Sequence, residues 1–368
     1  MKLAIVAGEA SGDLHASEVV RELRKVDPAL EMFGIGGDRL AGQGMTLLHH
    51  AREMGIVGLV NVLRHLPMFR RIFADLMKRI EAERPDAVLL VDYPDFNLRV
   101  AKKCRKLGLR VIYYISPQIW AWRRGRVRQI ARTVDRMIVI FPFEETFYIE
   151  HGVNVTYVGH PLVEELHGIR GRNKNSGRLR IALMPGSRRM EVRSLLPPML
   201  DAIEILGKER EIEAYVIQAP TISVRELRAA MGDREMAIVP HDGGQALADA
   251  DLALSSSGTA TLESAILDTP VVVMYRLSPA TYFLAKRLVK LPHFSLVNIV
   301  AGKRVVPELL QSEVNGPRIA AEVRALLEPS HYAAVRGELA TVRGRLGDPG
   351  ASQRVANEIL RMAEAGEA

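Results

Sequence analysis

The 368-residue sequence contains one cysteine, Cys104. A single cysteine cannot form an internal disulfide bond, and it cannot build a zinc site from cysteine ligands. This composition is typical of proteins that fold in a reducing compartment. Aromatic residues are also scarce, at 5% of the chain. Because RNA-binding surfaces combine basic side chains with aromatic ones, this scarcity argues against nucleic acid as a partner.

Several patterns that would define other classes of protein are missing. No apolar run is long enough to span a membrane. The chain starts with a strand-like run, Leu3–Ala7, and then a glycine and acidic residues, which predicts a folded N-terminus and no signal peptide. There is no Gly-x-x-x-x-Gly-Lys-Ser/Thr loop, no Gly-x-Ser-x-Gly elbow and no His-Glu-x-x-His motif. We therefore expect neither a P-loop ATPase nor an α/β-hydrolase, and no metal or cofactor.

The charge is shifted towards cations. Lysine and arginine number 50 against 43 aspartate and glutamate residues, which gives a formal net charge of +7. A basic protein attracts anionic partners such as nucleotides or phospholipid surfaces. Arginine carries most of the excess, and its planar guanidinium suits the recognition of phosphate groups.

Strand-like and helix-like runs alternate along the chain, which predicts an α/β protein with parallel sheets covered by helices on both faces. Residues 168–177 are polar, punctuated by glycine and without periodicity, so we interpret them as a linker. We predict two doubly wound Rossmann-like domains facing across a cleft, with a C-terminal helix packing back on the first. The predicted limits are 1–167, 178–345 and 346–368 for the two domains and this helix. The expected strands are 3–7, 32–35, 87–91, 110–115, 136–140 and 155–158, then 179–184, 213–217, 236–239, 252–254 and 271–275.

The stretch from Ser255 to Ala265 is the strongest candidate for a ligand site. A short apolar run precedes it and a helical pattern follows, so it is a strand-to-helix turn of small residues. Glycine allows a ligand to approach closely, and free N–H groups at the start of a helix attract phosphate. The alternative is an ordinary capped helix without a ligand. The candidate residues are Ser257, Gly258, Thr259, Thr261 and Glu263, the last as an acceptor for ribose hydroxyls.

A second loop of this kind is Gly186-Ser187-Arg188, between a predicted strand and a predicted helix. In open parallel sheets, ligands bind beyond the carboxyl ends of the strands, where this loop is expected. An arginine there can hold a diphosphate through a bidentate contact. A solvent-facing turn is the alternative interpretation.

Two loops of the first domain carry carboxylates at the same edge of the sheet. Asp92 and Asp95 follow a buried strand, and a carboxylate there could take a proton from an attacking hydroxyl. Alternatively, Asp95 or Asn97 caps the following helix. In the first loop, Glu9 or Asp13 could orient a sugar hydroxyl, and Asp13 could equally be a cap. The other candidates in these loops are Ser11, Gly12 and Asn97.

Two further clusters of metal-ligand residues are better explained without a metal. His49 and His50 have no partner histidines at ligand spacing. Asp249-Ala250-Asp251 comes before its strand, which places it at the end of the sheet away from the ligand loops. We therefore reject both as metal sites.

The segment from Ile56 to Phe73 is apolar and basic, and Pro67 divides it into two helical pieces. One interpretation is a pair of core helices with a charged outer face. The other is a membrane-surface patch with its arginines on lipid phosphates. A basic run that follows Trp120 and Trp122 and includes Arg126 could extend such a surface or line the cleft. The candidate patch residues are Ile56, Val60, Leu63, Leu66, Phe69, Arg70 and Arg71.

Several blocks in a fixed order resemble the lipid-A-disaccharide synthase family, glycosyltransferases with the two-domain GT-B fold. One difference is Val297, where we would expect proline before Asn298. The resemblance covers nearly the whole chain. The blocks are residues 7–13, 93–97, 116–123, 158–161, 184–189, 257–263, 295–298 and 306–311.

The resemblance implies a reaction and its partners. The donor is a UDP-glucosamine with two acyl chains, and the acceptor is the matching diacylglucosamine 1-phosphate. It further implies that Arg188 and the 257–259 turn bind the diphosphate, that Glu263 binds the ribose, and that Asn298 and Gln311 lie nearby. Asp95 matches the position of the base. We expect a cytoplasmic enzyme peripherally associated with the inner membrane, and a homodimer is one option for its assembly.

This reaction agrees with the residues. The donor bond is α and the product bond β-1,6, so one displacement with inversion needs one base and a group that stabilises departing UDP. Arg188 and main-chain N–H groups can do this without a metal. Two alternatives stay open: another UDP-sugar enzyme, such as an epimerase or a peptidoglycan-type transferase, or a non-catalytic nucleotide- or RNA-binding protein.

Overall fold

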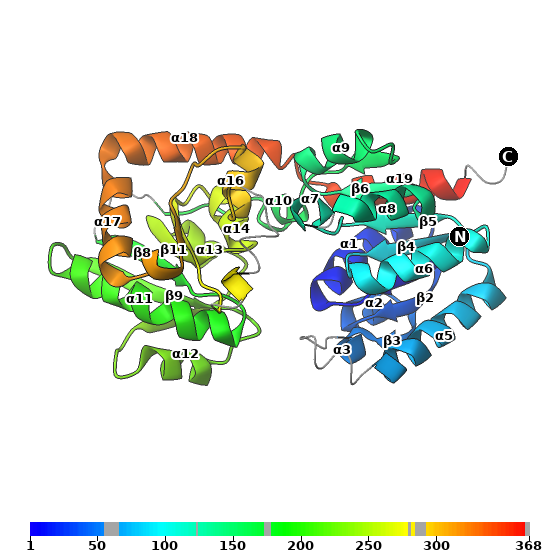
Figure 1. Ribbon diagram of the computed structural model, residues 1–368, viewed down its shortest axis with the longest axis horizontal. Coiled ribbons are helices and arrows are strands. Elements are labelled where there is room, and N and C mark those ends of the chain that lie inside the picture. Colours follow the sequence, from blue (N-terminus) through cyan, green and yellow to red (C-terminus); the bar gives the residue numbers. More distant parts are fainter. Residues whose placement is uncertain (55–65, 123, 173–177, 279–280, 284–291, 365–368) are drawn as a thin grey trace. The chain divides into compact units, whose positions relative to one another are not determined.

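The computed structural model describes residues 1–54, 66–122, 124–172, 178–278, 281–283 and 292–364 (Figure 1). The chain divides into two compact units. Unit 1 comprises Met1–Pro161 together with Asp348–Ala368, and unit 2 comprises Leu162–Gly347. The predicted limits of 1–167, 178–345 and 346–368 stay a prediction.

Unit 1 is built on a sheet with the strand order β3-β2-β1-β4-β5-β6-β7 among the described residues. Each pair of neighbouring strands is parallel. The residues of Leu3–Ala7 and Ala87–Val91 are fully buried, as expected for central strands covered on both faces. The strands are β1 (Lys2–Ala7), β2 (Glu31–Gly36), β3 (Thr46–His50), β4 (Ala87–Val91), β5 (Val111–Tyr114), β6 (Arg136–Val139) and β7 (Val155–Tyr157).

The C-terminal helix belongs to unit 1. Helix α19 (Ala351–Glu364) packs against α1 (Ala10–Val26), and Val355 and Ile359 are buried. Arg110 donates hydrogen bonds to the carbonyl oxygens of Met362 and Ala363, at 2.6 and 2.7 Å, and so binds the end of the helix. The other helices are α2 (Asp38–Gly42), α3 (Ala51–Met54), α5 (Leu66–Glu83), α6 (Pro94–Lys106), α7 (Ile119–Trp122), the 3-10 helix η1 (Arg124–Arg126), α8 (Val127–Thr133) and α9 (Pro142–Ile149).

Unit 2 contains a second parallel sheet, with the order β10-β9-β8-β11-β12-β13 in the part of the chain that the structure describes. Its strands are β8 (Leu179–Met184), β9 (Ile212–Gln218), β10 (Ala237–Pro240), β11 (Leu252–Ser256), β12 (Val271–Tyr275) and β13 (Glu308–Leu310). Helix α11 packs against α17, and α14 packs against α18 (Figure 1). The helices are α10 (Pro161–Glu165), α11 (Arg189–Gly207), α12 (Val224–Met231), α13 (Gln245–Ala248), α14 (Ala260–Ile266), α16 (Leu296–Ala301), η2 (Gln311–Glu313), α17 (Gly316–Leu327) and α18 (Pro329–Arg345).

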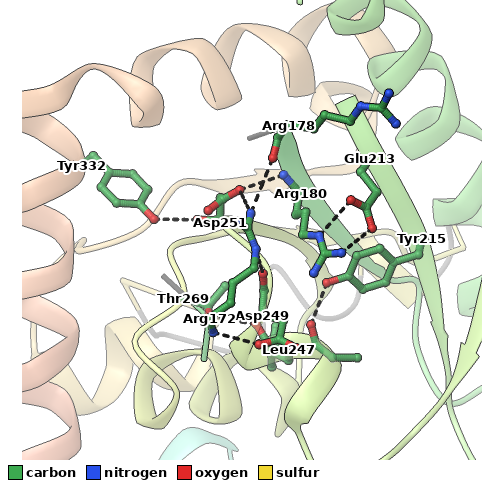
Figure 2. Close-up of polar contacts among 11 residues, drawn as sticks. Arg172, Arg178, Arg180, Glu213, Tyr215, Leu247, Asp249, Asp251, Thr269 and Tyr332 are labelled. Carbon is green, nitrogen blue, oxygen red and sulfur yellow. Dashed lines mark hydrogen bonds and ion pairs between the residues drawn. The ribbon is translucent and has the colours of Figure 1, made fainter. Parts of the chain in front are cut away.

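The two carboxylates of the Asp-x-Asp motif, Asp249 and Asp251, bind Arg172 in the predicted linker. The backbone N–H of Arg172 donates to Asp249 Oδ1 at 2.9 Å, and Arg172 Nη2 donates to Asp251 Oδ2 at 2.7 Å (Figure 2). The backbone N–H of Arg180 donates to the same Asp251 oxygen at 2.8 Å. Arg172 is therefore anchored at the amino end of β11, and the rest of the linker, 173–177, lies outside the described residues.

The predicted α/β class with two Rossmann-like parallel-sheet units is confirmed. Two strands were missed, and both lie at an edge of their sheet. Strand β3 ends in two histidines and is partly exposed, so it shows no apolar run, and β13 has only three residues. None of the described helices combines the length and apolarity that crossing a bilayer would need.

Candidate active site

The strand order of each sheet reverses at one point. In unit 1 this point lies between β1 and β4, and in unit 2 between β8 and β11. A crevice forms there outside the carboxyl ends of the strands, and ligands of doubly wound proteins bind in it. The four loops that follow these strands contain the predicted residues at 8–13, 92–97, 185–189 and 257–263.

A pocket of about 320 Å³ in unit 2 joins the two loops that the sequence predicted separately. Its wall combines cationic, hydroxyl and carboxylate side chains with exposed main chain, a composition that suits a nucleotide diphosphate. The predicted residues in this wall are Gly186, Ser187, Arg188, Ser257, Gly258, Thr259 and Glu263. Thr261 is fully buried behind it, where its hydroxyl donates to the Gly258 carbonyl oxygen at 2.8 Å.

The Gly186 loop is organised by a carboxylate that the sequence did not single out. Glu191 Oε2 accepts hydrogen bonds from the backbone N–H groups of Ser187 and Arg188, at 3.1 and 3.3 Å. Arg188 Nη1 also donates to Glu191 Oε1 at 3.1 Å, yet the arginine side chain is 74% exposed. The guanidinium can therefore turn towards an anion, whereas the amides are held by Glu191.

The turn after β11 is anchored by a hydrogen bond of Ser257, and space is open beside Gly258. Ser257 Oγ donates to the Phe294 carbonyl oxygen at 2.9 Å. At Gly258, apart from the residue itself and its two chain neighbours, no described atom lies within 4 Å of where a Cβ would be. The open space beside Gly258 lets a ligand approach the main chain closely.

His241 is a pocket residue that the sequence analysis missed. Its Nε2 atom lies 3.5 Å from Glu263 Oε2, and both residues line the pocket. The hydrogen bond that His241 donates to the Glu263 carboxylate raises the pKa of His241 above its ordinary value, although burial opposes the shift. His241 follows β10 directly, so its place after a strand was the signal that could have found it.

Asn298 and Gln311 do not belong to this pocket wall. Asn298 is fully buried, and its Oδ1 atom accepts from the backbone N–H groups of Val305 and Val306 at 2.7 and 3.0 Å. Gln311 exchanges hydrogen bonds with the backbone of Leu277, at 2.7 and 3.0 Å. Both side chains therefore hold loops of unit 2. The resemblance implied only that they lie near the ligand, and it gave no indication of this role.

A second pocket, of about 330 Å³, lies in unit 1. Two predicted catalytic residues, Glu9 and Asp95, line it together with Arg99. The rest of its wall is mainly apolar: Leu66, Phe69, Tyr93, Pro94 and Phe96. The pocket therefore combines carboxylates, a cation and apolar side chains, as an amphipathic ligand would require.

The backbone after β4 is strained at this pocket. Asp92 and Tyr93 have φ angles of 47° and 48°, in the left-handed region that residues other than glycine rarely adopt. The Asp92 carbonyl oxygen accepts from Tyr113 Oη at 2.6 Å and from Asn97 Nδ2 at 2.7 Å, which holds this conformation. The Tyr93 ring lies against Gly8, where a Cβ would come within 2.8 Å of it. Strain of this kind concentrates at functional sites.

Asp92 is a second carboxylate to consider beside Asp95. Burial, together with the negative charge of Glu9, raises the pKa of Asp92 to about 6. Asp95 is different, because its side chain is exposed and forms an ion pair with Arg126. The sequence had named Asp92 with Asp95, but only the structure distinguishes their environments.

The other predicted residues of unit 1 have structural contacts. Asp13 is buried, and its carboxylate accepts from the backbone N–H groups of Gly37, Arg39 and Leu40 at 2.7, 3.1 and 3.2 Å. It therefore binds free N–H groups at the start of α2, and it does not cap its own helix α1, whose N-cap residue is Glu9. Gly12 is buried beneath the loop, whereas Ser11 is exposed.

Asn97 is also buried at this edge of the sheet. Its Nδ2 atom donates to the carbonyl oxygens of Val6, Val91 and Asp92, at 3.4, 3.1 and 2.7 Å. Its Oδ1 atom has no hydrogen-bond partner among the described residues. Asn97 thus joins the ends of β1 and β4 beneath the pocket.

The predicted membrane patch is only partly described. Ile56, Val60 and Leu63 lie outside the described residues. Leu66 and Phe69 are half-buried in the wall of the unit 1 pocket. Arg70 and Arg71 are exposed on α5, whose opposite face buries Ile72, Leu76, Met77 and Ile80.

No group of three or more metal-ligating side chains occurs in the described part of the chain. His49 lies within 3.2 Å of Asp75 and 3.4 Å of Glu53, and His50 lies 3.3 Å from Asp38. Both histidines therefore have acidic partners near the surface.

Comparison with known proteins identifies close relatives over almost the full length. The family model described as lipid-A-disaccharide synthetase matches residues 3–343. A lipid-A-disaccharide synthase from Myxococcus xanthus is 44% identical, over 98% of this chain and 97% of the relative. One from Geobacter sulfurreducens is 42% identical over the same shares.

Solved structures with the same fold are far more distant in sequence. CalG4, the calicheamicin glycosyltransferase, superposes with a TM-score of 0.63 at 14% identity, covering 100% of this chain and 99% of that one. A UDP-GlcNAc 2-epimerase from Neisseria meningitidis, bound to UDP-GlcNAc, superposes with a TM-score of 0.64 at 14% identity, covering 98% and 100%. At this identity the likeness establishes the fold alone.

Proposed function

The chain belongs to the lipid-A-disaccharide synthetase family and is a glycosyltransferase, and we propose that it joins two acylated glucosamine units. The donor is UDP-2,3-diacylglucosamine, and the acceptor is 2,3-diacylglucosamine 1-phosphate. The products are the β-1,6-linked disaccharide 1-phosphate and UDP. The structural observation that supports this proposal is the unit 2 pocket, which combines Arg188, the 257–259 turn and Glu263.

The donor nucleotide binds in unit 2. Arg188 holds the diphosphate, because its exposed guanidinium can turn from Glu191 and form paired hydrogen bonds with phosphate oxygens. The Thr259 hydroxyl and the main chain at Gly258 are further contacts in this wall. Glu263 accepts from the ribose hydroxyls, and His241 supports its carboxylate. Thr261, Asn298 and Gln311 hold the surrounding loops.

Asp95 of unit 1 is the base. It accepts the proton of the acceptor 6-hydroxyl as that oxygen bonds to the anomeric carbon of the donor, and the bond to UDP breaks with its electron pair going to UDP. Arg188 stabilises the negative charge that develops on the leaving group. One displacement of this kind converts the α bond of the donor into the β bond of the product.

Glu9 and the apolar wall of the unit 1 pocket bind the acceptor. Glu9 orients a sugar hydroxyl from a position exposed beside Asp95, and Ser11 is a further exposed polar group of that loop. Leu66 and Phe69 contact acyl chains, which agrees with an acylated substrate. Asp13 and Asn97 hold the loops that carry Glu9 and Asp95.

The same segment brings the enzyme to the cytoplasmic face of the inner membrane. Leu66 and Phe69 contact the lipid, and Arg70 and Arg71, which are exposed, contact lipid phosphates. Replacing Leu66 and Phe69 with serine should shift the protein from the membrane fraction to the soluble fraction. If a folded double variant kept the wild-type distribution, these side chains would serve the pocket alone.

The direct test mixes the purified protein with the acylated donor and acceptor in detergent. Disaccharide and UDP should form in equal amounts, and a chelator should leave the rate unchanged. A non-acylated UDP-glucosamine in place of the donor is the matched control and should react poorly. Failure of the wild-type protein to form disaccharide would contradict the proposal.

The second candidate is another reaction of a UDP-sugar, because the fold is shared with a UDP-GlcNAc 2-epimerase. It predicts conversion of non-acylated UDP-sugars without an acceptor. Product analysis of the control reaction distinguishes the two functions. Salt-dependent RNA binding without UDP release would instead favour a non-catalytic protein.

A further inference from the structure

The exposed Asp95 carboxylate is paired with an arginine that the sequence placed only in a basic run. Arg126 Nη2 donates to Asp95 Oδ1 across 31 residues of chain. The Asp95 side chain is 74% exposed, whereas that of Arg126 is 25% exposed. The arginine is therefore the better-held member of the pair, and it lies on the 3-10 helix η1 between α7 and α8.

The chain that follows Arg126 is fixed to the helix that carries Asp95. Val127 and Ile130 of α8 are buried in the core of unit 1. Gln129 Nε2 donates to the carbonyl oxygen of Leu98 on α6 at 3.2 Å. This contact and the packing of α6 on α8 fix the distance between Arg126 and Asp95.

The chain that precedes Arg126 is fixed to another part of the core. Trp120 Nε1 donates to Glu144 Oε1 at 3.0 Å, and the backbone N–H of Phe141 donates to Glu144 Oε2 at 3.3 Å. Both Trp120 and Glu144 are buried, and the indole packs edge-on against Phe143 with ring centroids 4.8 Å apart. The backbone carrying Arg126 is thus held at both ends.

A base must present an oxygen to the proton with good alignment. A carboxylate has about four lone-pair directions, so a held arginine that occupies one of them fixes the plane of the carboxylate.

We propose that Arg126 is a positioning residue that fixes the direction from which Asp95 accepts the acceptor proton. The inference rests on the proposed function, in which Asp95 is the base. The opposing interpretation is an ordinary surface ion pair, which adds little to stability and nothing to turnover.

The test compares Arg126→Ala, Arg126→Gln and Arg126→Lys with Arg128→Ala, which removes an exposed arginine two residues away on α8. Steady-state kinetics give kcat and KM for each substrate, and calorimetry gives the UDP dissociation constant. We expect Arg126→Ala and Arg126→Gln to lower kcat by roughly 10- to 100-fold. KM for the donor and UDP binding should stay near wild type, and Arg126→Lys should retain an intermediate kcat.

Adding free guanidinium provides a measurement that would not change if Arg126 had only a structural role. Millimolar guanidinium should restore part of the kcat of Arg126→Ala, because the free cation can occupy the vacated site beside Asp95. It should not stimulate the wild-type protein or Asp95→Ala. A kcat for Arg126→Gln equal to that of Arg128→Ala, or no rescue of a folded Arg126→Ala, would overturn the inference. An inactive wild-type protein would instead refute the proposed function.

Discussion

Substituting Gly186 should distinguish between two interpretations of its loop: a loop held in place by Glu191, and an ordinary turn. The φ angle of Gly186 is +118°, and an added Cβ would lie 2.4 Å from Glu191 Oε2 and 2.7 Å from Glu191 Cβ. Alanine at this position must therefore adopt a rarely populated backbone conformation and also displace Glu191. Moving Glu191 breaks its hydrogen bonds with the Ser187 and Arg188 amides.

Two costs make up the expected loss of stability. The backbone conformation costs about 1–3 kcal/mol for a residue other than glycine. Loss of the charge-assisted hydrogen bonds adds roughly 1 kcal/mol, since the amides are exposed and water replaces the carboxylate. We expect Gly186→Ala to lower the free energy of unfolding of unit 2 by about 3 kcal/mol, and its melting temperature by roughly 6–12 °C.

The matched control is Gly337→Ala, the same substitution inside α18 of the same unit. Gly337 is exposed, and no described atom other than those of its chain neighbours and the nearby helix backbone lies within 4 Å of where a Cβ would be. Alanine is favoured over glycine inside a helix by about 0.5–1 kcal/mol, so this variant should be stabilised.

Urea unfolding and thermal melting of both full-length variants measure the difference, and calorimetry measures UDP binding, which should weaken in Gly186→Ala alone. A Glu191→Ala background should reduce the cost of Gly186→Ala, because it removes the carboxylate from the collision. Equal melting temperatures for the two glycine variants would refute the reasoning.

Three further predictions concern ionisable groups. Asp95→Ala should lower kcat by roughly 10²- to 10⁴-fold with unchanged UDP affinity, because only proton transfer is lost; normal turnover would remove Asp95 from the mechanism. Burial raises the pKa of Glu144 from 4.5 to about 8, so the folded protein keeps a proton that the unfolded chain releases. The stability from this proton is fully present below pH 4.5 and is lost as the pH rises through about 8, by up to roughly 1.4 kcal/mol per pH unit. Glu144→Gln should flatten this decline in urea unfolding measured across that range, and an unchanged slope would contradict it. Glu263→Gln should lower the pKa of His241 in an NMR titration, since Glu263 is the largest cause of its upward shift; an unmoved titration would show that the two side chains do not interact.

Much of the site could be predicted because its loops follow strands with a clear pattern. Buried parallel strands appear as short apolar runs, and the residue after such a run lies at the edge where ligands bind. This placed Gly186–Arg188 and Ser257–Glu263 at one edge before any contact was known, and the structure finds them in one pocket wall. His241 also follows a strand, which the sequence predicted at 236–239, so the same rule could have found it.

The roles of similar side chains could not be read from the same pattern. Asp13 and Asp95 are both acidic residues in the first turn of a helix. Asp13 accepts from amides that lie 24 to 27 residues further along the chain, whereas Asp95 pairs with Arg126, 31 residues away. Local spacing contains no information about these partners.

The sequence by itself determined the alternation of strands and helices apart from two edge strands, the chemistry of the four loops and, through its ordered motifs, the family. It could do so because backbone conformation and burial depend on neighbours a few residues apart. Only the tertiary structure decided that Glu191 holds the Gly186 loop, that Asn298 and Gln311 hold loops, and that Arg126 accompanies Asp95. These assignments depend on hydrogen-bond partners that the sheet order and helix packing bring together. The role of each of these side chains is therefore set by the residues that it contacts in the folded chain.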